Sequence, residues 1–236
     1  MIEFNYKALP WNIVFAVGGL QTLPNELDKL GKRRALILTT PNQAEQGREL
    51  AKLLGDRAVG LFDQAAMHVP AATLEAATDF CHSLAADCTV ALGGGSTIGL
   101  GKALAVKEGL DNIVIPTSYA GSEMTDIWAV TEAERKVTAR NYAAVPTLTL
   151  YDPQLTLTLP PEFSAASGLN AMAQAVVNVA TDKPNPIISS LALDGIRALA
   201  ASLPIIMKDP QNIEARSQAL YGASMAGGAL GTGITS

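Results

Sequence analysis

Aromatic and charged residues are both scarce in this sequence, at 5% and 17% of its 236 residues. Apolar residues make up 48%, which is enough for a substantial hydrophobic core. Alanine and glycine are abundant. This balance favours helices packed tightly against a sheet over an aromatic-rich β-sandwich. The length predicts one large domain or two modest ones.

Three further absences narrow the class of protein. The net charge is −5 and no basic run occurs, so we expect no nucleic-acid partner. The first residues lack a charged segment followed by a long apolar one, so we expect no secretory signal. No uninterrupted apolar stretch reaches 18 residues, so we expect no membrane span. Together these features predict a cytoplasmic protein.

Cysteine and histidine are rare, with two residues of each. Cys81 and Cys88 do not have zinc-site spacing, and one pair of cysteines is weak evidence for a disulfide. We therefore expect buried, reduced thiols. His82 follows Cys81 in an expected helix and is interpreted as a surface or packing residue. That leaves His68 as the histidine of functional interest.

Short apolar runs alternate with helical patterns through the first 150 residues. Because parallel strands are buried on both faces, they read as continuous apolar runs. Strand, helix, strand at this spacing predicts a parallel sheet with right-handed crossovers. The expected strands are 13–17, 35–39, 59–62, 89–92, 113–116 and 147–151, and the expected helices are 24–31, 43–54, 71–86 and 97–107.

The character of the chain changes in its last third. Residues 132–140 are polar and charged, with no strand expected there, and Pro160-Pro161 punctuates the sequence. From Glu162 onward the patterns are helical. The sequence therefore predicts an α/β fold: a parallel-sheet nucleotide-binding domain (residues 1–159), then the start of an all-helical domain (residues 160–236). The helices expected there are 165–180, 186–203 and 214–230.

One expected strand runs directly into Gly93-Gly94-Gly95-Ser96, and a helix follows. Glycines allow the backbone to turn sharply and to approach an anion closely. A helix N-terminus adds unpaired N–H groups and partial positive charge. Ser96 could cap this helix or donate to a phosphate oxygen. The pattern is neither GxGxxG nor GxxxxGK[ST], and a tight strand–helix turn without a ligand is the alternative.

A second polar loop, residues 116–123, follows the next expected strand and contains Thr117, Ser118 and Tyr119. Ligands of open parallel sheets bind where strands deliver their carboxyl ends. Two loops of small hydroxyl residues at neighbouring strand ends therefore reinforce the prediction of a nucleotide site.

At this point the motifs resemble a known family. The run from Gly93 to Ala103, the loop 116–125 and Tyr151-Asp152-Pro153 resemble maleylacetate reductases of the iron-containing (group III) alcohol dehydrogenases, with a dehydroquinate-synthase-like fold. The likeness extends to Met67-His68-Val69-Pro70 and Ser167-Gly168-Leu169-Asn170-Ala171. It implies reduction of maleylacetate to 3-oxoadipate, in the degradation of aromatic compounds, in a cleft between two domains.

The resemblance also implies roles for individual residues. Lys136 matches a lysine near the nicotinamide ribose, although a solvated surface lysine is the alternative. His68 matches a histidine that could donate a proton or bind an anion, although packing within a loop is the alternative. We assign catalysis to His68, Lys136 and Tyr119. We assign cofactor binding to Thr40, Asn42, Gly93, Gly94, Gly95, Ser96, Thr97, Thr117, Ser118 and Lys136.

Cofactor choice follows from the residues after the second strand. An acidic side chain there would bind the ribose 2′-hydroxyl and repel a 2′-phosphate. This chain has Thr40, which is neutral, so we expect it to use either NADH or NADPH.

The sequence departs from the family at the metal site. An Asp and a His four residues apart on one helix hold the metal in metal-dependent members, and here these positions are Asn170 and Gln174. Two neutral amides make a poor site, so we expect no metal. The family also continues beyond the last residue here, with a histidine-rich helix, so the chain is expected to be shortened at its C-terminus.

Three functions remain in competition. The first is a maleylacetate reductase acting on a small dicarboxylate, with a homodimer as a further expectation. The second is a truncated, catalytically impaired relative that binds nucleotides as a scaffold. The third is an alcohol or aldehyde dehydrogenase of the same family, against which Tyr119 and Asn170 argue.

Overall fold

The structure is a computed structural model that describes residues 3–133, 135–181 and 185–232. By its internal packing the chain divides into two compact units, which we call the α/β unit and the helical unit. The α/β unit comprises Trp11–Pro116 and Asp126–Asp152. The helical unit comprises Met1–Pro10, Thr117–Thr125 and Pro153–Ser236.

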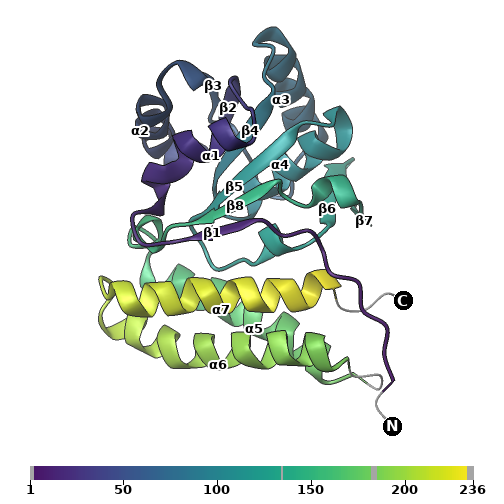
Figure 1. Cartoon of the computed structure of the whole chain (residues 1–236), viewed down its shortest axis with the longest axis vertical. Helices are drawn as coiled ribbons and strands as arrows, with labels where there is room; N and C mark the ends of the chain where they lie inside the picture. Colours follow the sequence, from purple (N-terminus) through teal and green to yellow (C-terminus); the bar gives the residue numbers. More distant parts are fainter. Residues whose placement is uncertain (1–2, 134, 182–184, 233–236) are drawn as a thin grey trace. The chain divides into compact units, whose positions relative to one another are not determined.

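The α/β unit is built on a six-stranded sheet in the order β1-β8-β5-β4-β2-β3, and all its pairings are parallel (Figure 1). The predicted parallel sheet is therefore confirmed. Both β2 and β4 are buried at every residue, which explains their uninterrupted apolar sequences. The strands are β1 (Ile13–Phe15), β2 (Ala35–Leu38), β3 (Ala58–Phe62), β4 (Cys88–Gly93), β5 (Asp111–Pro116) and β8 (Leu148–Tyr151).

Helices cover both faces of this sheet, and β3 shows the two faces clearly. Leu61 packs against Gly47 of α2, whereas its neighbour Gly60 packs against Phe80 of α3. Side chains of adjacent strand residues point to opposite faces, so α2 and α3 lie on opposite sides (Figure 1). The helices are α1 (Leu23–Lys29), α2 (Ala44–Leu54), α3 (Ala71–Ser83) and α4 (Gly95–Glu108).

An antiparallel hairpin, β6 (Ile127–Glu132) and β7 (Arg135–Arg140), was not expected from the sequence. Residues 132–140 were interpreted only as a polar, charged stretch. All six residues of β7 are exposed, so no alternation of apolar and polar residues marks it as a strand. The hairpin is formed by backbone pairing, which composition alone does not reveal.

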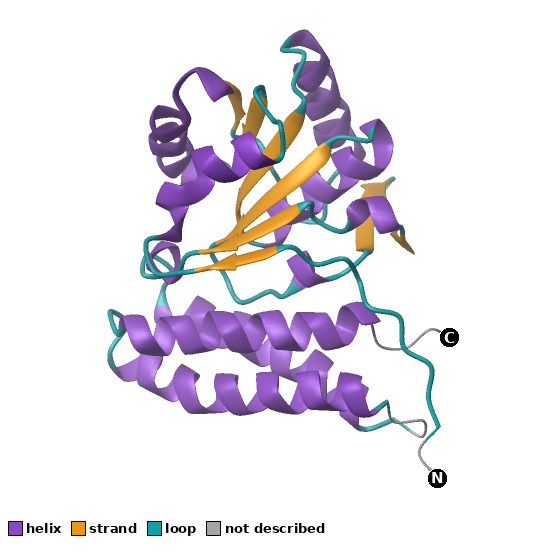
Figure 2. Ribbon diagram, in the orientation of Figure 1, coloured by secondary structure: helices purple, strands orange, loops and turns teal. Residues whose placement is uncertain are grey.

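The described residues of the helical unit form three long helices, in agreement with the helical patterns of the last third (Figure 2). They are α5 (Pro161–Val179), α6 (Pro186–Lys208) and α7 (Ile213–Thr232). Pro186 occupies the first turn of α6, where no N–H is needed. The side chain of Asn185 caps this turn by accepting from the N–H groups of Ile187 and Ile188.

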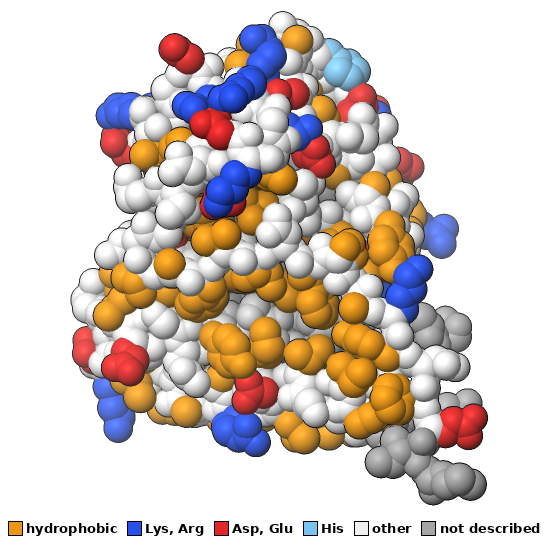
Figure 3. Space-filling view, in the orientation of Figure 1, with side chains coloured by type: hydrophobic (Ala, Val, Ile, Leu, Met, Phe, Trp, Pro, Cys, Tyr) orange, Lys and Arg blue, Asp and Glu red, His pale blue; other side chains and the backbone are white. Residues whose placement is uncertain are grey.

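Apolar side chains remain exposed on the helical unit, and on the face shown they gather over α6 and α7 (Figure 3). Ile187, Leu193 and Tyr221 are among them, and they line a hollow of about 770 Å³. In length and composition α6 could cross a membrane, since one window of 18 residues has a mean hydropathy of 1.5. Since 39% of that window is buried within the protein, this is weak evidence, and the absence of a membrane span stays a prediction.

The division by packing differs from the expected boundary near Leu159-Pro160. The helical unit begins its continuous part at Pro153 and also takes in Thr117–Thr125. One close backbone approach lies within this unit. A Cβ added to Gly227 of α7 would lie 2.1 Å from the carbonyl oxygen of Gly121. Contacts between segments so distant in sequence leave no local signal.

Both cysteines are free and buried, as expected. Burial raises the pKa of the Cys81 thiol to about 11, and burial also raises the pKa of Cys88. Both thiols are therefore protonated at neutral pH and behave as small apolar side chains.

The end of α3 yields a stability prediction. Ala85 has φ +46°, a left-handed conformation. The N–H of Ala86 bonds to the carbonyl of Cys81 and that of Ala85 to His82, which is the Schellman pattern. We expect Ala85→Gly to raise the free energy of unfolding by about 0.5–1 kcal/mol, because glycine adopts this conformation without steric cost.

Urea unfolding would measure this gain. The matched control is Ala76→Gly at an exposed position inside the same helix. It should lower the free energy of unfolding by about 1 kcal/mol. Equal losses in the two variants would contradict the assignment of Ala85 to the left-handed position.

Candidate nucleotide-binding site

The expected phosphate loop lies where β4 ends and α4 begins. Gly93 is the last residue of β4, and α4 starts at Gly95. Gly94 is the N-cap, with no side-chain hydrogen bond to the helix, and the first turn has no acidic residue. Ser96 therefore lies inside the first turn and is not the cap, and its alternative role as a donor to a phosphate oxygen stays a prediction. The N–H groups of this turn remain suited to an anion.

Gly93 and Thr97 form a narrow cradle at this turn. A Cβ added to Gly93 would lie 2.5 Å from Oγ1 of Thr97 and 2.9 Å from Oε1 of Gln43, so no larger residue fits. Thr97 is fully buried, and its Oγ1 has no hydrogen-bond partner. A buried hydroxyl without a partner costs stability. The side chains of Thr97 and Gln43 thus fill the space beside Gly93, and the groups at this turn that suit a phosphate are the N–H groups at the start of α4.

The segment after β2 lies against this cradle. β2 pairs with β4, so their carboxyl ends are neighbours. Thr40 precedes the short 3-10 helix η2 (Pro41–Gln43), and its hydroxyl donates to Oε1 of Gln43 over 3.2 Å. Asn42 is exposed in η2. The structure thus brings Thr40 and the glycine loop together through Gln43.

Sequence reasoning missed Gln43. Its position could have indicated a place in the site, because Gln43 lies three residues after Thr40 in a turn that follows a buried strand. The side chain of residue 43 was assigned only to the start of a helix, and its contact with Gly93 spans 50 residues of sequence.

His68 and Lys136, two of the residues assigned to catalysis, lie near each other through Thr131. The hydroxyl of Thr131 donates to the carbonyl oxygen of His68 over 2.8 Å, and its N–H donates to Val69 over 2.9 Å. In the hairpin, Thr131 is the direct cross-strand partner of Lys136. His68 is exposed and has a left-handed backbone, φ +64°. Lys136 is exposed as well.

Val69 joins this group to the phosphate helix. Its Cγ2 lies 3.0 Å from the Cβ position of Gly99 in α4. The hairpin, the loop of His68 and α4 are therefore packed together within the α/β unit. Whether His68 and Lys136 act in catalysis stays a prediction.

Thr117, Ser118 and Tyr119 follow the last residue of β5, but by their packing they belong to the helical unit. Thr117 is buried and Ser118 is half-buried. Tyr119 is fully buried, and its hydroxyl accepts from Nη1 of Arg216 over 3.2 Å. This placement gives the Tyr119 hydroxyl a packing role, so the catalytic role assigned to it has no support from its surroundings.

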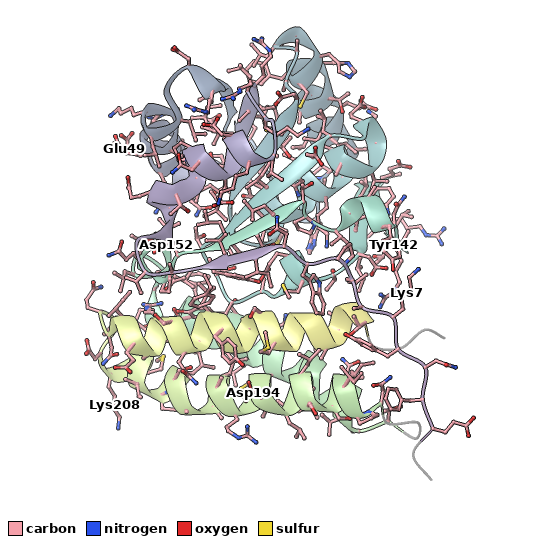
Figure 4. The ribbon with its side chains drawn as sticks, viewed as in Figure 1. Lys7, Glu49, Tyr142, Asp152, Asp194 and Lys208 are labelled. Carbon is pink, nitrogen blue, oxygen red and sulfur yellow. The ribbon has the colours of Figure 1, made fainter. Side chains whose placement is uncertain are left out.

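Asp152, the centre of the Tyr151-Asp152-Pro153 motif, fixes the turn after β1 (Figure 4). Its two carboxylate oxygens accept from the N–H groups of Gly18, at 2.9 Å, and Leu20, at 3.0 Å. Gly18 has φ +74°, a conformation that glycine adopts without steric cost.

At the two family positions for a metal this chain carries Asn170 and Gln174, and the expectation that no metal binds stays a prediction. Asn170 and Gln174 lie on α5, one exposed and one half-buried. Both carry neutral amides, which bind a divalent cation weakly. Among the described residues, no group of three or more His, Cys, Asp or Glu side chains could hold a metal ion.

A parallel α/β sheet with a glycine turn at a helix N-terminus is typical of nucleotide-binding proteins. Residues 10–153 match the family described as iron-containing alcohol dehydrogenase, and residues 164–235 match the C-terminal part of that family. The chain therefore belongs to the iron-containing alcohol dehydrogenase family.

Named relatives narrow the comparison. The chain is 50% identical over 230 residues to a maleylacetate reductase of Sphingobium indicum, covering 98% of this chain and 65% of that protein. It is 46% identical over 231 residues to a maleylacetate reductase of Burkholderia cepacia, covering 98% and 66%. The chain thus spans about two thirds of the length of these relatives.

Solved structures of the same family are similar to this chain over nearly all of its length. A maleylacetate reductase from Agrobacterium tumefaciens has a TM-score of 0.97 at 44% identity, over 100% of this chain and 67% of the other. An iron-containing alcohol dehydrogenase from Corynebacterium glutamicum has a TM-score of 0.94 at 36% identity, over 98% and 65%. The α/β fold predicted from the sequence is confirmed.

Thr97 allows a prediction in which NADH affinity and the free energy of unfolding change in different directions. Thr97→Val removes the unpaired buried hydroxyl while keeping the shape of the side chain. We expect its free energy of unfolding to stay equal or to rise by about 1 kcal/mol. We expect weaker NADH binding, measured by fluorescence titration.

The matched control is Thr89→Val, because the Thr89 hydroxyl is also buried but donates to Oδ1 of Asn112 over 3.0 Å. That variant should lose about 1–2 kcal/mol of stability. A loss of the same size in Thr97→Val would show that its hydroxyl is paired.

Proposed function

We propose that this protein is an NAD(P)H-dependent oxidoreductase that reduces maleylacetate to 3-oxoadipate in the degradation of aromatic compounds. The observation that carries this proposal is the 50% identity over 230 residues to a maleylacetate reductase. The N–H groups at the start of α4 support the use of a dinucleotide.

The cofactor supplies the hydride, and the protein binds and orients the reactants. The N–H groups at the start of α4 would hold the pyrophosphate of the cofactor. Thr40 and Asn42 would bind the adenosine ribose. Thr117 and Ser118 would contribute hydroxyls to the nucleotide.

The substrate is a small dicarboxylate. Lys136 would attract its negative charge. Because 3-oxoadipate retains the ketone, the hydride would add to one carbon of the double bond conjugated to that ketone, and His68 would supply the proton that the other carbon of the double bond takes up. The exposure of both side chains supports this assignment, as does the attachment of both backbones to Thr131. Asn170 and Gln174 do not fit a metal, and no step of this reaction passes through one.

A loss of NADH absorbance with maleylacetate would test the activity. We expect turnover with wild-type protein. Lys136→Met should raise KM for maleylacetate roughly tenfold or more, since an ion pair to a carboxylate at about 1.4 kcal/mol corresponds to that factor. The control is Lys52→Met, an exposed lysine of α2 paired with Glu49. A KM unchanged in Lys136→Met would remove Lys136 from the site.

Thr40 provides a separate test of cofactor choice. A neutral residue here does not repel a 2′-phosphate, so kcat/KM for NADH and NADPH should differ by less than about a thousandfold. Thr40→Asp should depress kcat/KM for NADPH by roughly tenfold or more and spare NADH, because a carboxylate repels the 2′-phosphate. Equal effects on both cofactors would separate Thr40 from the ribose.

A second function is favoured by the two amides at Asn170 and Gln174: a relative that binds nucleotide without chemistry. It differs from the first in one outcome, NADH binding with no turnover of maleylacetate. Turnover of a small alcohol instead would favour a dehydrogenase of the same family.

The buried, reduced thiols support a cytoplasmic location, and a homodimer remains part of the proposal.

A further inference from the structure

Arg216 of α7 is fully buried, although arginine is almost never found so deep without a partner of opposite charge. Its guanidinium donates to neutral oxygens instead. Nε donates to the carbonyl of Pro210 over 3.0 Å, Nη2 to Leu159 over 3.0 Å, and Nη1 to the hydroxyls of Ser164 and Tyr119. A buried cation costs free energy, so this arrangement must be held by all of these bonds together.

The hydrogen bond from Arg216 to Tyr119 determines which group donates in each bond of a short hydrogen-bonded chain. A guanidinium only donates, so the Tyr119 hydroxyl accepts from Arg216. The Tyr119 hydroxyl then donates to Oγ1 of Thr156 over 3.3 Å, and Thr156 donates to the carbonyl of Pro153 over 2.8 Å. The side chain of Tyr119 is therefore held at its far end by a cation and by a hydroxyl.

The loop that carries Tyr119 has a second anchor. Gly121, two residues on, has φ +72° and lies against Gly227 of α7. A Cβ on Gly227 would lie 2.1 Å from the Gly121 carbonyl oxygen. The anchors at residues 119 and 121 both lead to α7, and they fix the backbone that immediately follows Thr117 and Ser118.

We infer that Arg216 is a positioning residue for the cofactor. Through Tyr119 it holds Thr117 and Ser118 in the arrangement that binds the dinucleotide. This inference rests on the proposed function, in which these two hydroxyls contact the nucleotide. It also gives Tyr119 a role that differs from catalysis: its hydroxyl transmits the position of the guanidinium to the loop.

The test measures NADH affinity by fluorescence titration, at a temperature where every variant is folded by circular dichroism. Arg216→Lys keeps the charge but loses the planar set of donors. Tyr119→Phe keeps the ring and removes the acceptor. Each should raise Kd for NADH roughly tenfold, a change of about 1.4 kcal/mol. The control is Arg197→Lys, an exposed arginine of α6 bonded to Asp194, and its Kd should equal that of wild type.

A double-variant cycle, which compares Kd for NADH in the single and double variants, distinguishes positioning through Tyr119 from a purely structural role. If Arg216 acts through Tyr119, the variant with both changes should bind NADH no more weakly than Arg216→Lys alone. Multiplied effects would show two independent contributions and overturn the inference. If Arg216→Lys does not fold, Gly227→Ser displaces the same loop from its other anchor and should raise Kd in the same way.

The outcomes separate this inference from the proposed function. Wild-type protein that fails to bind NADH would refute the proposed function. Wild-type protein that binds NADH, with an unchanged Kd in Arg216→Lys and Tyr119→Phe despite a lower Tm, would refute the positioning role alone. A fall in kcat for Tyr119→Phe with no change in Kd would restore Tyr119 to catalysis and also overturn the inference.

Discussion

The register of β4 between β2 and β5 is the constraint on which the candidate site depends. Leu38 pairs with Ala91, and Gly93 pairs with Pro116. These pairings bring the ends of three strands to one edge of the sheet, where Thr40 and the glycine loop begin. Because β4 is buried on both faces, a slip of one residue would exchange one buried face for the other, so the register depends on how individual side chains pack against the helices on each side.

The sequence predicted the strands and helices of the α/β unit well because they are local and buried. In a chain where such runs alternate with helical patterns, a continuous apolar run such as Ala35–Leu38 indicates a strand that is buried on both faces. The glycine turn was also predictable, since a strand that ends in three glycines has few alternatives to a sharp turn before a helix. The family resemblance then attached a function to that turn.

What the sequence could not reveal depends on contacts between distant residues. The bonds of Arg216 reach Tyr119 and Leu159, which are 97 and 57 residues away. Gln43 touches Gly93, and Thr131 joins the loop of His68 to the strand of Lys136. The β7 strand has no buried face, so the pattern that marks other strands is absent from it. The sequence did not reveal these features because the residues are far apart in the chain or because the strand is exposed.

The exposed strand β7 has a consequence for the behaviour of the protein in solution. The hairpin is a sheet of two strands, so among the residues that the structure describes no strand pairs with the outer side of β7, whose backbone donors and acceptors face outward. Such edges invite pairing between molecules, and charged side chains on the edge oppose it. Arg135, Lys136 and Arg140 give this strand three positive charges. We therefore expect Lys136 to oppose pairing between molecules whether or not it binds a substrate.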